Sequence, residues 1–138
     1  MVERDVVLAK AATIDRCLAR VAEVRGRPGG ALLPIDVEDL VVLNITRASH
    51  AAADLAAHVV ASEGYGLADT LAAAFTILEK HGIIEADLAA KLRAAAGFRN
   101  VAVHAYQAVD ARIVDAIATH HVADLRAFAA KMVARYAG

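Results

Sequence analysis

Apolar residues recur along much of the chain at alternating steps of three and four, the spacing of one face of an α-helix. The first such run spans residues 5–24, and Gly26 and Pro34 bound the interruption that follows it. Asp36 is then the expected N-cap of a second helix that reaches about Ala61. The apolar positions of the first helix are Val7, Ala11, Ile14, Leu18 and Val21.

A turn and a shorter helix are expected next. Residues 62–66 read SEGYG, which is turn-forming by composition. A helix over 68–81 would then carry Leu71, Phe75 and Leu78 on its inner face. Gly82 is the expected stop, because glycine readily adopts the conformation that ends a helix.

Two further helices complete the prediction. One runs from Ile83 to about His104, and the step of four beyond its inner stripe lands on Arg99. Asp110 looks like the cap of the last helix, which reaches nearly to the C-terminus. No strand-like alternation competes, so the pattern predicts an all-α, up-and-down bundle of about five helices in a single domain, residues 1–138. The inner positions of these two helices are Leu88, Leu92 and Ala95, and Ile113, Ile117, Leu125, Phe128 and Met132.

Composition narrows the class of protein. Hydrophobic residues make up 59% of the 138 residues but aromatic residues only 4%, so alanine-rich helices that approach closely must build the core. The net charge of −1 provides no general basic field, so any nucleic acid would have to be held by a local site. The lone Cys17 and the absence of a signal peptide or a long apolar run predict a cytoplasmic protein with no membrane contact.

Polar side chains lie at helical spacing on the second helix. Asn44, Arg47, Asp54 and His58 fall on one stripe, with Ala51 in the gap. A solvated outer face is the simpler interpretation. In the functional interpretation, Arg47 or Asp54 lines a cleft with Arg99 and orients the Arg or a histidine.

The strongest chemical candidate is the segment GFRNVAVHAY, which holds Arg99, Asn100, His104 and Tyr106. Arg offers a fixed fork of donors for phosphate, and His exchanges a proton near neutral pH. Asn100 and His104 would stack on one side of a helix, and Tyr106 could turn back toward them if the helix ended at or just after His104. The alternative is structural: Arg99 pairs with an acid, and the others satisfy a helix end.

The sequence argues against a metal or another cofactor. His120 and His121 are adjacent and diverge on a helix, and His50 and His58 lie two turns apart. Because there is no cysteine cluster and no histidine pair at ligand spacing, we expect no metal site.

From Arg99 the motif has the form R-N-x-x-x-H-x-Y, preceded by Gly97 and Phe98. It resembles the signature of the HepT-like toxins, a branch of the HEPN superfamily. The resemblance extends upstream to AAADLAAHVV, with Asp54, and to FTILEKHGIIEADLAAKL. It implies a helical homodimer that is a metal-independent endoribonuclease toxin. It also implies an RNA substrate and a partner, a minimal nucleotidyltransferase antitoxin that transfers AMP to the motif tyrosine.

Carried over by residue, the resemblance gives each motif side chain a role. Arg99 would hold the phosphate, His104 would be the general acid or base during attack by the RNA 2′-hydroxyl, and Asn100 would orient the site. Tyr106 would accept AMP, whose charge and bulk would block the cleft. Two other readings stay open: a non-catalytic nucleotide-binding or interaction module that docks a nucleotidyltransferase, and a structural helical adaptor.

Overall fold

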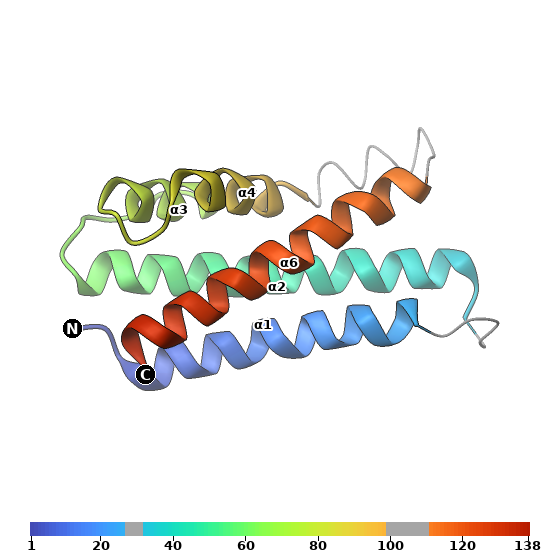
Figure 1. The fold of residues 1–138 in the computed structure, drawn as a ribbon, viewed down its shortest axis with the longest axis horizontal. Coiled ribbons are helices and arrows are strands. Elements are labelled where there is room, and N and C mark those ends of the chain that lie inside the picture. The colour runs from blue at the N-terminus through green and yellow to red at the C-terminus, as the bar shows by residue number, and fades with distance from the viewer. Residues whose placement is uncertain (27–31, 99–110) are drawn as a thin grey trace.

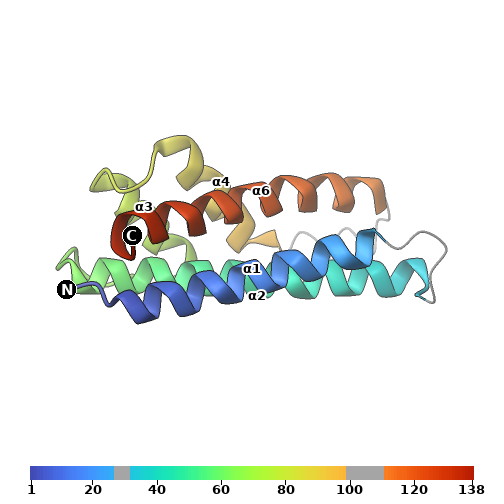
Figure 2. The same ribbon diagram turned by 60° about the horizontal axis from the view of Figure 1, so that its bottom comes forward.

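The computed structural model describes residues 1–26, 32–98 and 111–138, with no side chain described at residues 111–114 and 117. Within this part, the structure contains five helices and no strand, as expected of an all-α protein. The long helices α1 (Arg4–Arg25) and α2 (Pro34–Ser62) run antiparallel, side by side. Helix α6 crosses over them, and the shorter α3 and α4 lie beside α6 over the C-terminal half of α2 (Figure 1 and Figure 2).

Helix α2 begins earlier than its sequence pattern suggested. Leu33 occupies the N-cap position and Pro34 the first helical turn, where the fixed φ angle of proline fits and its missing N–H is not needed. Asp36 lies in the first turn, and its Oδ2 accepts a hydrogen bond from the Leu33 N–H at 3.0 Å. The expectation that Asp36 is the N-cap is therefore wrong. From the first turn of the helix, the Asp36 carboxylate instead accepts the backbone N–H of the N-cap residue, Leu33.

The predicted turn over residues 62–66 is confirmed. Gly64 and Gly66 have φ angles of 74° and 108°, a region that side chains with a Cβ avoid. Between them, Tyr65 stacks on His81, with ring centroids 3.8 Å apart. This ring pair ties the turn to the end of α3.

Helix α3 (Leu71–Lys80) begins three residues later than expected, because the Thr70 hydroxyl accepts a hydrogen bond from the Ala73 N–H at 3.1 Å and caps it. Phe75 and Leu78 are buried as predicted. Leu71 was expected to point inward but is 40% exposed, since it lies in the first turn at the solvent end of the helix.

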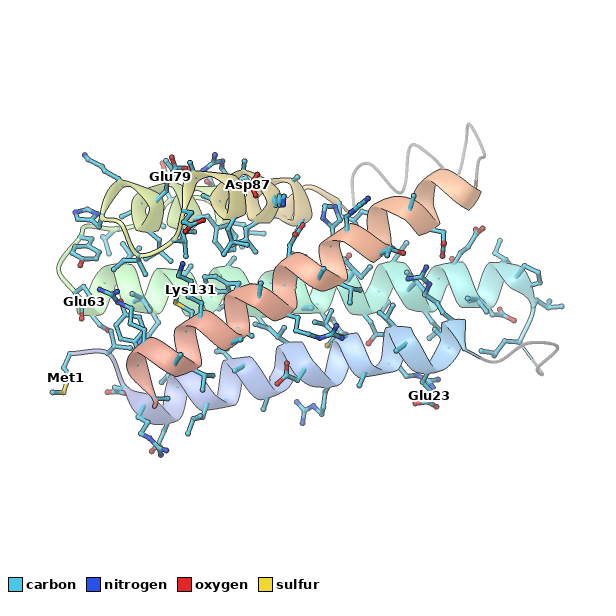
Figure 3. All side chains as sticks on the ribbon, viewed as in Figure 1. Met1, Glu23, Glu63, Glu79, Asp87 and Lys131 are labelled. Carbon is cyan, nitrogen blue, oxygen red and sulfur yellow. The ribbon has the colours of Figure 1, made fainter. Side chains whose placement is uncertain are left out.

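Helix α4 (Ala86–Ala96) is shorter than expected at both ends. The preceding Ile83 and Ile84 are buried in the connection after Gly82, whose φ of 70° ends α3 as predicted. Gly97 is the C-cap of α4, so one helix running from Ile83 to about His104 is wrong. A salt bridge of 3.0 Å between Arg93 and Glu79 joins α4 to α3, and Figure 3 shows Glu79 on this layer.

Helix α6 (Ala111–Tyr136) runs nearly to the C-terminus, as expected. Its Phe128 meets Phe75 of α3 edge to face, with ring centroids 5.5 Å apart. The predicted cap Asp110 and the side chains of Ile113 and Ile117 lie outside the described residues. The other expected inner residues of α6 are fully or almost fully buried: Leu125, Phe128 and Met132.

Alanine lets the helices approach closely, as the composition suggested. Ala48, Ala52 and Ala56 on α2 have no exposed surface. The two termini meet at one end of the bundle, where the Arg4 Nε donates to the Ala137 carbonyl at 3.2 Å. Figure 3 shows Met1 at this end. Helix α6 begins toward the opposite end, at the N-terminal half of α2 (Figure 1).

Candidate functional site

The four motif residues Arg99, Asn100, His104 and Tyr106 lie outside the described residues, so their expected roles stay predictions. The structure describes what lies on both sides of the motif in sequence. Phe98 immediately precedes Arg99, and α6 begins shortly after Tyr106. The described part of the candidate site therefore consists of two flanks of the motif, Phe98 before it and the early turns of α6 after it, and of the contacts that hold them.

Phe98 fixes the entry to the motif. Gly97, which ends α4, donates its N–H to the carbonyls of Arg93 and Ala94 at 3.3 and 3.1 Å. Its φ of −90° is one that other residues adopt, so the turn itself does not require glycine. Phe98 follows with 1% of its surface exposed. A buried ring one peptide bond before Arg99 anchors the chain at that point.

The contact of Phe98 with α6 is made by a histidine. The rings of Phe98 and His121 meet edge to face, with centroids 5.2 Å apart and an angle of 74° between their planes. His121 is only 7% exposed, and its Nδ1 is buried with no hydrogen-bond partner among the described residues. This pair links the end of α4 to the middle of α6.

Burial lowers the pKa of His121 below the ordinary value. The nearby Asp124 opposes this shift, and the neighbouring His120 adds to it. The imidazole is therefore neutral at physiological pH. Sequence reasoning weighed His121 only as a metal ligand. One signal could have found it: position 121 continues the buried stripe of α6 that includes Ala118, Leu125 and Phe128.

The flank after the motif is held by Arg25, the last residue of α1. Its Nη2 lies 2.6 Å from Asp115 Oδ1 and donates to the Thr119 hydroxyl at 2.8 Å. Thr119 Oγ1 in turn donates to the Asp115 carbonyl at 2.9 Å. These contacts join the early turns of α6 to the end of α1. The sequence offered no direct signal for them, since the partners lie far apart along the chain.

The polar stripe on α2 is not a uniform solvated surface. Asn44 is buried at 6% exposure, and its Nδ2 donates to the Leu40 carbonyl at 2.8 Å. His58 Nε2 accepts a hydrogen bond from the Glu3 N–H at 3.1 Å, just before α1. Because Asn44 is buried, the outer-face interpretation is wrong for this residue. Its amide can be buried because its N–H donor is satisfied by a carbonyl of the same helix.

Arg47 and Asp54 are both exposed, as the outer-face interpretation requires. Asp54 Oδ2 lies 3.3 Å from Lys10 Nζ on α1. Burial raises the pKa of the Cys17 thiol, and the positive charge of Arg47 partly offsets this, which places Arg47 beside α1 as well. Their predicted support of a cleft with Arg99 involves a residue outside the described part and stays a prediction.

Two buried hydroxyls on α2 lie three residues apart. Thr46 Oγ1 and Ser49 Oγ have no hydrogen-bond partner among the described residues. Hydroxyls elsewhere in the chain bond the carbonyl one turn earlier, as Thr13 does to Ala9 at 3.2 Å. Helix α2 therefore carries unused hydrogen-bonding capacity in the interior.

Within residues 1–26, 32–98 and 111–138, no group of three histidine, cysteine or acidic side chains is arranged to hold a metal ion. None of the helices in this part is both long and apolar enough to span a membrane.

Comparisons with known proteins identify a matching family and a related protein. The family described as ribonuclease HepT-like matches residues 14–132. The mRNA nuclease HepT of Shewanella oneidensis is 32% identical over 124 residues, which cover 90% of this chain and 93% of the relative.

Solved structures agree with the sequence match. A crystal structure of a toxin–antitoxin with AMP-PNP superposes with a TM-score of 0.82 at 31% identity, covering 94% of this chain and 98% of the other. A tri-AMPylated HEPN toxin from Shewanella oneidensis, in complex with MNT antitoxin, also gives 0.82, at 32% identity and the same coverage. The sequence match and the shared fold both show that this chain belongs to the HepT-like ribonuclease family.

Proposed function

We propose that this chain is the ribonuclease toxin of a toxin–antitoxin pair and that it cuts RNA without a metal ion. As a HepT-like ribonuclease it is an endoribonuclease. The finer proposal is that Arg99 and His104 of two copies meet across a dimer cleft and cut there. AMP transfer to Tyr106 by a nucleotidyltransferase antitoxin then silences the enzyme.

The observation that carries the proposal is the motif R-N-x-x-x-H-x-Y inside the matched range 14–132. A relative named as an mRNA nuclease supports RNA as the substrate class. A solved relative that is a tri-AMPylated toxin bound to MNT antitoxin supports both the partner and the modification.

The chemistry needs only proton transfer and charge stabilisation. Removal of the proton from an RNA 2′-hydroxyl lets that oxygen attack the adjacent phosphorus, closing a cyclic phosphate and expelling the 5′-oxygen, which takes up a proton. His104 is suited to these proton transfers. Arg99 stabilises the extra negative charge on the phosphate oxygens, and Asn100 orients the group.

The two held flanks support this role, because catalysis of this kind depends on exact positioning. Phe98 is buried against His121 on one side of the motif. On the other side, Arg25 holds the early turns of α6 through Asp115 and Thr119. Both anchors reduce the freedom of the residues that they hold, Phe98 before the motif and the early turns of α6 after it.

Cleavage by the unmodified protein in EDTA tests the proposed reaction. His104→Ala should lower the rate of RNA cutting by roughly 10²–10⁴-fold while leaving the circular dichroism spectrum unchanged, since a general acid–base group contributes about that much. His120→Ala is the matched control, because this exposed histidine lies outside the motif. Undiminished cutting by His104→Ala would overturn the proposal.

Intact mass tests the modification. Co-expression with a nucleotidyltransferase partner should add whole AMP units to the wild-type chain and none to Tyr106→Phe, and only the unmodified protein should cut RNA. Addition of AMP to Tyr106→Phe would rule out this acceptor. If the wild-type protein binds nucleotide tightly and never cuts RNA, the chain is the non-catalytic binding module instead.

Arg47 and Asp54 are proposed as supports of the cleft. The Asp54 salt bridge with Lys10 fixes that carboxylate near α1, whereas no side-chain hydrogen bond or ion pair within the described part of the chain holds Arg47, so Arg47 is the better candidate to reach RNA. Arg47→Ala should weaken RNA binding, measured as a rise in KM. Unchanged KM would contradict the proposed role of Arg47 in the cleft.

A further inference from the structure

The first half of α2 and its cap expose large apolar side chains. Leu33 is 64% exposed, Ile35 60% and Leu43 43%. They are three of the six large apolar side chains that are exposed in the described part of the chain. Helices α3 and α4 lie over the other half of α2 (Figure 1 and Figure 2). Exposed apolar side chains that gather on one element indicate a surface that contacts another protein.

Leu43 lies at the centre of a symmetrical order of charge on this helix. Asp39 precedes Leu43 by four residues and Arg47 follows it by four, so the three lie on one stripe. Asp36 and His50 lie seven residues before and seven after Leu43, which places them on the same face. One side of Leu43 is therefore acidic and the other basic, with the same spacing in both directions.

These polar groups are available to a partner. Asp39, Arg47 and His50 are exposed, and their side chains make no hydrogen bond or ion pair within residues 1–26, 32–98 and 111–138. Asp36 uses Oδ2 for the N–H of Leu33, which leaves its Oδ1. The charges on this face are thus not used to hold the described helices together.

A second copy of the same chain matches this order. When two identical helices pack antiparallel about a twofold axis, each residue before the centre faces the residue equally far after it on the other helix. An axis at Leu43 brings the two Leu43 side chains together and sets Asp39 of each copy against Arg47 of the other. Ridges of residues four apart pack helices in this way. A parallel arrangement in the same register would instead set like charges against each other.

We propose, resting on the ribonuclease function proposed above, that two copies of this chain associate through the first half of α2. Leu43 packs on the partner's Leu43, and two Asp39–Arg47 ion pairs flank this contact. Asp36 and His50 meet in the same way farther out. Helix α6, which follows the motif in sequence, begins toward this half of α2 (Figure 1). A guanidinium has five N–H donors, so a paired Arg47 keeps donors for the contact with RNA proposed above.

Charge reversal at single positions tests this surface through the mass of the particle in solution. Asp39→Arg sets two arginines against each other in both ion pairs, and Arg47→Asp does the same with two carboxylates. Each variant alone should need a roughly tenfold or higher concentration to dimerise than the wild type, because like charges then meet at the contact. Asp15→Arg, which reverses an exposed acid on α1, is the matched control and should dimerise like the wild type.

An equal mixture of the two reversed variants is the decisive sample. One copy then carries arginine at both positions and the other carries aspartate at both, so each ion pair again joins opposite charges. The mixture should form dimers at a concentration at which each variant alone is monomeric. Native mass spectrometry should show one chain of each kind in these dimers. The double variant Asp39→Arg/Arg47→Asp should also dimerise with itself.

The apolar centre of the contact has its own test. Leu43→Glu places two carboxylates at the twofold axis and should dissociate the dimer. Leu67→Glu is the control, because Leu67 is 87% exposed in the connection between α2 and α3. This control should leave the mass of the dimer unchanged.

The outcomes are distinct. Reversed variants that dimerise like the wild type overturn the proposal, and so does a mixture that stays monomeric although circular dichroism shows both variants folded. If a reversed variant does not fold, Leu43→Glu against Leu67→Glu decides by the same measurement. RNA cutting by the wild type is measured separately. A dimer that responds as expected but never cuts RNA would refute the ribonuclease function and leave this surface standing.

Discussion

At the scale of single residues, chemistry and position are supplied by different side chains. The motif contributes the groups that we propose to handle phosphate and protons, whereas Phe98, which precedes it in sequence, makes a buried contact with His121. The two kinds of residue differ in how easily they are recognised from the sequence. Arg99 and His104 are polar residues in a segment that is otherwise rich in alanine and valine, whereas His121 is one of two adjacent histidines and has no distinguishing pattern around it.

The lowered pKa of His121 predicts how stability depends on pH. Burial lowers the pKa of His121 in the folded protein, so its imidazole takes up a proton at a lower pH than in the unfolded chain, where the pKa is near the ordinary value of about 6.5. The unfolded state therefore binds more protons as the pH falls below that value, and the free energy of unfolding decreases. Above it the contribution of His121 is constant.

Urea unfolding at a series of pH values between about 7.5 and 5 measures this effect. The free energy of unfolding of the wild type should fall more steeply toward acid than that of His121→Phe. The exposed His120→Phe variant should keep the wild-type slope. Identical slopes for the wild type and His121→Phe would show that folding does not lower the pKa of His121.

At the scale of elements, capping residues decide where the helices begin and end, and contacts between side chains of different helices hold them together. Pro34 and Thr70 start α2 and α3 at positions that the apolar spacing did not mark. Gly97 ends α4 before the motif, so the inner stripe of α4 does not continue unbroken to Arg99. The helix that precedes the motif in sequence therefore ends at Ala96.

The contact of Arg25 with α6 gives a prediction at this scale. Arg25→Ala removes both the salt bridge to Asp115 and the hydrogen bond to Thr119. Asp115 is largely exposed, so the free energy of unfolding should fall by only about 0.2–1 kcal/mol. The local effect should be larger, because the early turns of α6 lose their attachment to α1.

Hydrogen exchange followed residue by residue checks this. Amides around Asp115 and Thr119 should exchange faster in Arg25→Ala, while those around Phe128 stay protected. Arg20→Ala is the control, because the Arg20 salt bridge to Glu23 lies within α1. Equal exchange rates in the two variants would mean that Arg25 does not hold α6.

At the scale of the whole molecule, the bundle presents one motif per chain. One Arg and one His are sparse for an RNA-cutting site, and two copies facing each other double both. The homodimer stays a prediction, and the proposed shared cleft requires it. It also bears on the modest net charge of −1, since two arginines in the proposed cleft would concentrate positive charge locally.

Light scattering of the purified protein should give twice the mass of one chain. Cutting activity per chain should fall on dilution at the concentration where the mass drops to that of a monomer, because each site needs two motifs. A monomer that cuts RNA with undiminished activity per chain would contradict the shared cleft. The Phe128→Ala variant would not serve here, since it opens the core rather than the dimer.

The sequence by itself determined the helical class, the main helices and the identity of the motif. These features depend on local spacing and on residue types, which can be seen one turn at a time. Phe75, Leu78, Leu125 and Met132 are buried as their spacing predicted. The family also follows from the sequence, since the motif R-N-x-x-x-H-x-Y is specific enough to indicate it before any fold is known.

Only the tertiary structure decided which side chains meet across helices. The contacts of Phe98 with His121 and of Arg25 with Asp115 join residues distant in sequence, and no local pattern records them. The same holds for Asn44, which is buried although the spacing of the polar stripe favoured a solvated face. Local periodicity fixes the face on which a residue lies, whereas the packing of another helix against that face fixes what the residue does.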